Sequence, residues 1–165
     1  MSRLPALADA ELAAPVADLF DQIVRGGGAV PPVYRVLAHS PRAVAAWHGL
    51  SAPLREPGAL PLDLKELVVL RVAHLTGSTR QWAHHRELAV AAGIDQRKID
   101  AVRAGDDPGV FTATEQAALR VADRLDEETL LAVLDDLGAE QTVELVLVVS
   151  YYRCLAGVLA AFGLT

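Results

Sequence analysis

Residues 64–85 read LKELVVLRVAHLTGSTRQWAHH and decide the fold. The apolar run before Gly77 is long enough for a helix of several turns, and glycine is typical of the position that follows a helix C-terminus. Ser78, with a glutamine three residues later, has the form of a capping box that opens a second helix. The stretch therefore predicts two antiparallel helices, over residues 62–76 and 78–93, joined by a tight turn.

Glycine and proline divide the rest of the chain into further helical segments. Ser40 followed by Pro41 is typical of a helix start, and Thr112 with Glu115 has the form of another capping box. No segment alternates apolar and polar residues with the period of a strand, so the predicted fold class is all-α, an antiparallel helical bundle in a single domain over residues 3–165. The other predicted helices cover residues 9–25, 31–39, 41–54, a short segment from 95, 112–125, 126–137 and 140–162.

Composition and charge exclude several classes of function. Hydrophobic residues make up 52% and charged residues 22% of the 165 residues, which is the balance of a globular protein. The formal net charge is −6, whereas nucleic acids and anionic membranes attract clustered positive charge, so we expect neither as a partner. Glu144 and Arg153 interrupt the longest apolar stretch, residues 143–164, and predict a core helix. Residues 1–10 lack the pattern of a secretory signal, so we expect a cytoplasmic protein.

Helical geometry brings polar side chains of the hairpin together. At about 1.5 Å per residue, Glu66 lies roughly 16 Å before Gly77 and His85 roughly 12 Å after it. The same sum places His74 level with Gln81. A carboxylate beside an imidazole suits proton transfer near neutral pH. The spacing is equally compatible with a purely structural link between two helices.

The hairpin resembles the core of the carboxymuconolactone decarboxylase and alkylhydroperoxidase-D-like (AhpD-like) family. The resemblance implies an AhpD-like helical bundle, a small-molecule substrate, and an enzyme that needs neither a cofactor nor a metal. It also implies a homo-oligomer, as a dimer, trimer or hexamer. The residues that carry it are 64–70, Leu-Thr-Gly at 75–77, Trp-Ala-His-His at 82–85, Ala-Gly at 92–93, His-Ser-Pro at 39–41 and the tyrosines at 151–152.

The peroxidase branch of this family has a glutamate, a cysteine twelve residues later, and the pattern CxxCxxxH. Glu66 takes the place of the glutamate and His85 that of the histidine, whereas Ser78 and Gln81 take the places of the cysteines. Thiol–disulfide exchange needs two sulfur atoms, so we expect no thiol peroxidase activity. The typical C-terminal Tyr-x-Gly-x-Pro pattern of the decarboxylases is also absent, since residues 151–157 read YYRCLAG.

With this resemblance, we predict a lyase in which Glu66 and His85 are the catalytic acid/base pair. The predicted chemistry is decarboxylation or lactone chemistry on a small carboxylated or carbonyl compound. One alternative is an AhpD-like oxidoreductase remnant that uses the thiols of a partner. The other is a non-catalytic oligomeric binding or scaffold protein, in which the pair is structural.

Six further side chains form the predicted substrate-binding set, and each has a structural alternative. An indole can stack on a substrate or fill a core. A guanidinium can bind a carboxylate or form an internal ion pair, and a phenol can donate to a substrate or to a buried acceptor. The single cysteine, Cys154, is predicted to be a buried thiol. The predicted substrate-binding residues are Ser78, Gln81, Trp82, His74, Arg71 and Tyr151.

Residues 143–164 also bear on assembly. They are apolar around much of the helix circumference, more than a monomer of this length readily buries. The sequence thus predicts a homo-oligomer with the hairpin near a subunit contact.

Overall fold

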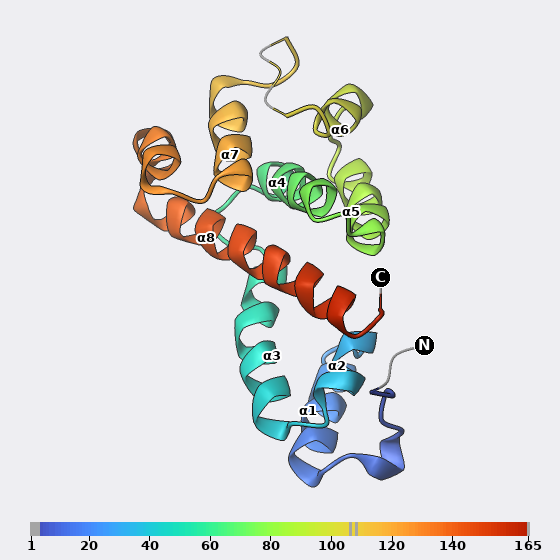
Figure 1. The fold of residues 1–165 in the computed structure, drawn as a ribbon. Helices are drawn as coiled ribbons and strands as arrows, with labels where there is room; N and C mark the ends of the chain where they lie inside the picture. Colours follow the sequence, from blue (N-terminus) through green and yellow to red (C-terminus); the bar gives the residue numbers. More distant parts are fainter. Residues whose placement is uncertain (1–3, 106, 108, 165) are drawn as a thin grey trace. The chain divides into compact units, whose positions relative to one another are not determined.

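The computed structural model describes residues 4–105, 107 and 109–164, and all regular structure in these residues is helical (Figure 1). The all-α prediction is therefore confirmed. The predicted first helix is divided, because Pro15 favours a new start and a short 3₁₀ segment precedes it. The elements are η1 Asp9–Glu11, α1 Ala14–Arg25, α2 Pro32–Leu37, α3 Pro41–Arg55, α4 Leu62–Leu75, α5 Thr79–Ala91, α6 Gln96–Ala101, α7 Ala113–Asp123 and α8 Glu127–Ala161.

The described chain forms two compact units. The first holds the chain up to Arg55 together with Leu159–Leu164, and the second runs from Glu56 to Val158. In the first unit α3 packs against α1 and α2, and the fully buried Tyr34 hydrogen-bonds through its hydroxyl to Ser51 Oγ at 2.7 Å. A single domain over residues 3–165 stays a prediction, and its two end residues lie outside the described part of the chain.

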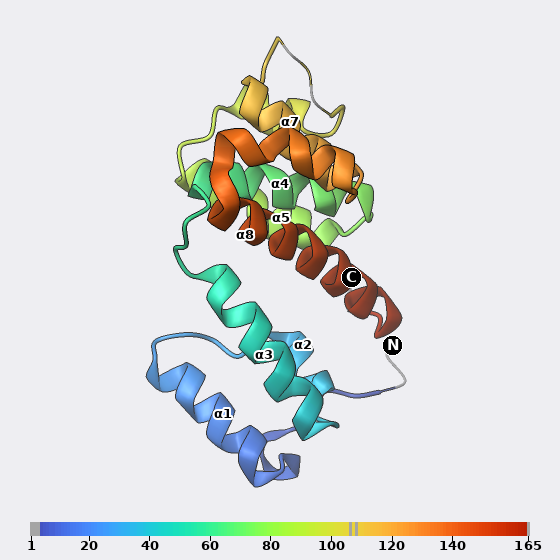
Figure 2. The same cartoon turned by 90° about the vertical axis from the view of Figure 1, so that its left-hand side faces the viewer.

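The second unit is built around α4. This helix contacts α5, α6 and α7, and Figure 2 shows it between α7 and α5. Every residue from Leu64 to Ala73 is buried, so α4 is enclosed on all sides, which is the pattern of a core helix. Apolar residues of α4 and of the segments packed around it form one buried cluster: Leu67, Leu70, Ala89, Ile99, Val102, Phe111 and Leu119.

In the turn between α4 and α5 the predicted role of the glycine is confirmed, whereas the predicted helix cap is not. Gly77 has φ +65°, the left-handed conformation that favours glycine after a helix. Ser78 precedes α5, yet its side chain makes no capping hydrogen bond, so the capping box predicted there is wrong. The box predicted at Thr112 and Glu115 is confirmed, with both side chains bonded to the reciprocal backbone N–H groups.

Helix α8 contains a break at Gly138, whose φ of +71° is not helical. The break confirms the prediction of two helices there. By length and composition alone α8 could cross a membrane, and 39% of its most apolar window is buried within the structure. A core helix of a folded protein passes the same test. Cys154 is exposed on this helix, so the prediction of a buried thiol is wrong.

Candidate functional site

Glu66 of α4 and His85 of α5 form a hydrogen-bonded pair inside the hairpin. His85 Nδ1 lies 2.7 Å from Glu66 Oε2, and the two side chains are only 6% and 4% exposed. When the carboxylate is ionised it has only lone pairs to offer, and Nδ1 is then the donor of this hydrogen bond. The contact that helical rise predicts is therefore confirmed, because two straight antiparallel helices with a tight turn keep their register.

Aromatic and amide groups of α8 and α5 surround the pair. The ring of Tyr152 meets the His85 ring edge-on, with centroids 4.8 Å apart, and Tyr151 packs against Tyr152 in the same way at 5.0 Å. Gln81 Nε2 donates to the carbonyl oxygen of Tyr152 at 3.4 Å. Within the described residues the His85 ring makes its only hydrogen bond through Nδ1. Its second nitrogen, Nε2, thus has no protein partner there.

Two buried polar atoms beside this cluster have no hydrogen-bond partner among the described residues. They are Ser78 Oγ and Gln81 Oε1, and their residues are 3% and 4% exposed. A buried polar atom without a partner carries a desolvation cost, and native structures rarely leave it so without a water or ligand. Each of the two residues that the resemblance places at the positions of the family's cysteines therefore carries an unsatisfied side-chain atom.

Arg71 is held by structural bonds. Its Nε donates to Asp123 Oδ1 at 2.5 Å, and its Nη1 donates to the carbonyl oxygens of Val102 and Arg103 at 3.1 and 2.7 Å. These bonds join α4 to the end of α7 and to the segment after α6. They account for its burial, and its role in substrate binding stays a prediction.

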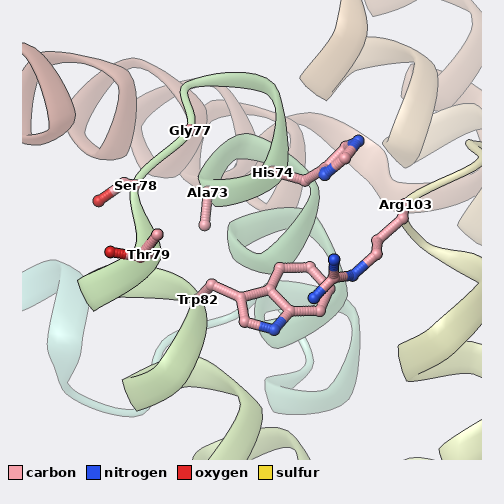
Figure 3. Close-up of a pocket in the computed structure, with 7 residues that line it drawn as sticks. All are labelled: Ala73, His74, Gly77, Ser78, Thr79, Trp82 and Arg103. Atoms are coloured by element: carbon pink, nitrogen blue, oxygen red, sulfur yellow. The ribbon is translucent and has the colours of Figure 1, made fainter.

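Three of the other predicted binding residues lie at the turn end of the hairpin (Figure 3). His74, Ser78 and Trp82 line a pocket of about 160 Å³ together with Ala73, Gly77, Thr79 and Arg103; we call it the turn pocket. The Arg103 guanidinium lies over the Trp82 indole, 4.1 Å from the ring centroid, and the His74 ring meets the indole edge-on at 6.4 Å. Neither Glu66 nor His85 is part of this lining. Sequence reasoning missed Arg103, because no periodicity or motif marks its segment.

Titratable groups that could hold a metal do not cluster in the described chain. No group of three or more His, Cys, Asp or Glu side chains is arranged for a metal ion among those residues. That the protein works without metal or cofactor stays a prediction.

Comparison with known proteins gives a family match for the central part of the chain. The model of the family described as "Carboxymuconolactone decarboxylase family" matches residues 41–124, which hold the whole α4–α5 hairpin. No curated protein matches the chain.

Three solved structures share its fold. A cysteine-to-alanine variant of the debrominase Bmp8 in complex with 2,3,4-tribromopyrrole has a TM-score of 0.76 at 18% identity, over 99% of this chain and 90% of that one. The apo form of Bmp8 gives 0.76 and 18%, over 99% and 91%. An alkylhydroperoxidase AhpD core, an uncharacterised peroxidase-related protein from Ralstonia eutropha JMP134, gives 0.75 and 17%, over 99% and 91%. The fold is therefore AhpD-like.

Proposed function

Because the chain belongs to the carboxymuconolactone decarboxylase family, we propose that it is a cofactor-free enzyme that transfers protons on a small carboxylated or carbonyl compound. The reaction would be of the decarboxylation or lactone type, which makes the protein a lyase-like member of the family. One observation carries the proposal: the buried hydrogen bond of 2.7 Å between His85 Nδ1 and Glu66 Oε2.

The pair supports acid/base chemistry at the second imidazole nitrogen. The carboxylate fixes the tautomer with the proton on Nδ1, so Nε2 presents its lone pair as a base. When Nε2 takes a proton from the substrate, the ring becomes positive and Glu66 stabilises it across the existing bond. The same nitrogen then returns the proton to the carbanion or leaving oxygen. Burial strengthens both steps, because water does not screen the charges.

The unsatisfied atoms beside the pair support a polar substrate. Ser78 Oγ can donate and accept, and Gln81 Oε1 can accept; both lack partners among the described residues. A substrate hydroxyl or carboxyl group would complete them. Tyr151, whose ring meets that of Tyr152 edge-on, is proposed to donate to a developing oxyanion.

A second candidate is a binding or scaffold protein in which the pair only joins two helices. The observation in its favour is the burial of Glu66 and His85 at 3% and 5% exposure, together with a pocket lining that leaves both out. In this case removing either partner strands a buried polar group. The cost would be about 3 kcal/mol or more of stability.

Thiol chemistry within one chain has weaker support. The sequence holds a single cysteine, which is exposed on α8. A dithiol reaction, as in an AhpD-like oxidoreductase remnant, would require sulfur from a partner protein. With serine and glutamine in the places that the resemblance gives to the cysteines, the glutamate–histidine pair is the reactive group that this chain's own hairpin supplies.

The test combines a ligand screen with two isosteric variants. A thermal-shift screen over small carboxylic acids and lactones identifies a ligand, because binding to the native state raises the melting temperature. With that compound, Glu66→Gln and His85→Asn should lower turnover about 10²–10⁴-fold while the melting temperature stays near that of the parent. A large fall in melting temperature with unchanged ligand binding would instead establish the scaffold. Unchanged turnover in both variants would remove the pair from the mechanism.

We also propose that the protein is a homo-oligomer. Several apolar side chains of α8 are exposed in the single chain, among them Leu131 at 60%, Val143 at 59% and Leu147 at 41%. Burying such surface between copies is favourable by about 25 cal/mol per Å². Light scattering at micromolar concentration should give at least twice the mass of the chain, and a monodisperse monomer would contradict this.

A further inference from the structure

The turn pocket is lined by basic side chains, although the chain as a whole is acidic. The chain has a formal net charge of −6, yet the described residues that line the pocket include no carboxylate, and the charged or basic ones among them are Arg103 and His74. An indole forms one wall. A cationic group beside an aromatic wall, in a protein that is acidic as a whole, selects for an anion with an apolar body.

Arg103 is held in place, while its guanidinium stays available to a ligand. Its backbone carbonyl accepts a hydrogen bond from Arg71 Nη1 at 2.7 Å, which fixes the main chain at this residue. Its guanidinium rests on the Trp82 indole at 4.1 Å, which fixes the side chain. In the described part of the chain this guanidinium makes no hydrogen bond or ion pair. Its donors are therefore oriented in advance, which lowers the entropy lost on binding an anion.

The other side chains restrict the shape of the ligand. In Figure 3 the hydroxyl groups of Ser78 and Thr79 point away from Trp82, so they do not face the cation. His74 and Ala73 remain on the α4 side of the indole. A volume of about 160 Å³ is well below the ~300–1,000 Å³ of pockets for drug-sized ligands. It suits a single ring or a short unsaturated chain.

We propose that the turn pocket binds a small planar carboxylate, such as an aromatic acid. The carboxylate pairs with the Arg103 guanidinium, and the planar body packs against Trp82 beside His74. This site is distinct from the glutamate–histidine pair in its lining, since neither Glu66 nor His85 is among the residues that line the turn pocket. The inference therefore stands or falls independently of the proposed reaction.

Inorganic anions fit the site less well. A phosphate or sulfate ion would pair with Arg103 but would leave the indole and the alanine methyl group unused. The planar acid uses both, and apolar contact adds to the charge-assisted bond. The comparison of an aromatic acid with inorganic phosphate therefore separates this proposal from simple anion attraction.

The experiment uses the full chain and benzoate as the probe. Calorimetric titration measures the affinity, and the indole N–H signals in a proton–nitrogen NMR spectrum report the place of binding. The chain has two tryptophans, and Trp82→Phe assigns the signal of the pocket. We expect saturable binding of benzoate with a shift of the Trp82 signal and none of Trp47. Benzamide, the neutral isostere, and inorganic phosphate should each bind at least about tenfold more weakly.

A charge-matched pair of variants completes the test. Arg103→Met removes the guanidinium and keeps an apolar stem, and it should weaken benzoate binding about tenfold or more. Arg97→Met makes the same change of net charge at an exposed position of α6 outside the lining, and it should change affinity less than about twofold. Equal losses in the two variants, equal binding of benzamide, or no saturable benzoate binding would each overturn the proposal. Melting temperatures of both variants verify that they are folded.

Discussion

The interior of the α4–α5 hairpin and its turn end both contain a histidine and an arginine, but these side chains differ in burial and in bonding. In the interior, the His85 ring is bonded to a carboxylate at 2.7 Å, and the Arg71 guanidinium is bonded to Asp123 and two carbonyl oxygens. At the turn end, His74 is exposed and the Arg103 guanidinium lies against an indole. Burial explains the difference, because an unpaired charge is expensive only where water is excluded.

The contrast separates groups that hold the fold from groups that remain available to a ligand. Arg71 and Arg103 are in direct contact through one hydrogen bond, from guanidinium to carbonyl at 2.7 Å. The Arg71 guanidinium donates its hydrogen bonds to protein groups. The Arg103 guanidinium is oriented by the Trp82 indole. Residue type alone does not distinguish the two, so stability measurements on matched variants are the means of testing the difference.

The largest expected effect on stability belongs to the interior arginine. Arg71→Met removes one partner of a partly buried ion pair and leaves Asp123 and two carbonyl oxygens without the donor that Arg71 supplies. The free energy of unfolding should fall by about 3–5 kcal/mol. Arg103→Met removes a guanidinium of the turn end, and it should cost about 1 kcal/mol or less. Urea denaturation of both variants measures the two costs. Similar values would show that the interior and the turn end do not differ as the geometry indicates.

The parts of the fold that follow from short-range chemistry were predictable from the sequence. The helical hairpin follows from apolar spacing and from Gly77, the position where the chain takes φ +65°. The pairing of Glu66 with His85 follows from the fixed rise of a helix on each side of that turn. The break at Gly138 likewise follows from a glycine between two helical segments.

The parts of the structure that depend on tertiary packing were not predictable from the sequence. Arg103 enters the turn pocket from a segment about twenty residues after Trp82, and no spacing rule connects them. The serine before α5 matches a local capping pattern, but packing buries its hydroxyl without the capping bond. The apolar surroundings of Cys154 in the sequence suggested burial, whereas α8 presents that residue to the surface of the single chain.

The second prediction compares two helix starts that look alike in sequence. Thr112 accepts a hydrogen bond from the Glu115 N–H at 3.2 Å, so Thr112→Ala should lower the free energy of unfolding by about 1 kcal/mol. Ser78, between the interior and the turn pocket, makes no such bond and buries an unsatisfied hydroxyl. Ser78→Ala should therefore be neutral or slightly stabilising. Thermal and urea unfolding of the two variants give the comparison, and a loss at Ser78 equal to that at Thr112 would mean that its hydroxyl is bonded in solution.

The smallest expected effect concerns the carboxylate that anchors the entry to α4, the helix shared by both regions. Glu144 of α8 accepts hydrogen bonds from the backbone N–H groups of Leu60 at 2.8 Å and of Ala59 at 3.0 Å. These bonds, that of Leu60 first, hold the pKa of the Glu144 carboxyl below its usual value of 4.5. A carboxyl whose pKa is lower in the folded state contributes stability above its unfolded pKa, and loses that contribution as the pH falls through the folded value.

Glu144→Gln should therefore lower the melting temperature at neutral pH, and the difference from the parent should shrink once the pH falls below 4.5. Glu140→Gln is the matched control, because Glu140 is exposed on the same helix. Its difference from the parent should stay small, with no loss of stability tied to this pH range. Melting curves of the three proteins are recorded from neutral pH to about pH 3. This range includes the reference pKa of a glutamate carboxyl, so the curves show how the melting temperature changes as the group is protonated. A Glu144→Gln difference that is constant across this range would show that the carboxylate does not hold the entry to α4, and that the helix carrying both regions is anchored by apolar packing alone.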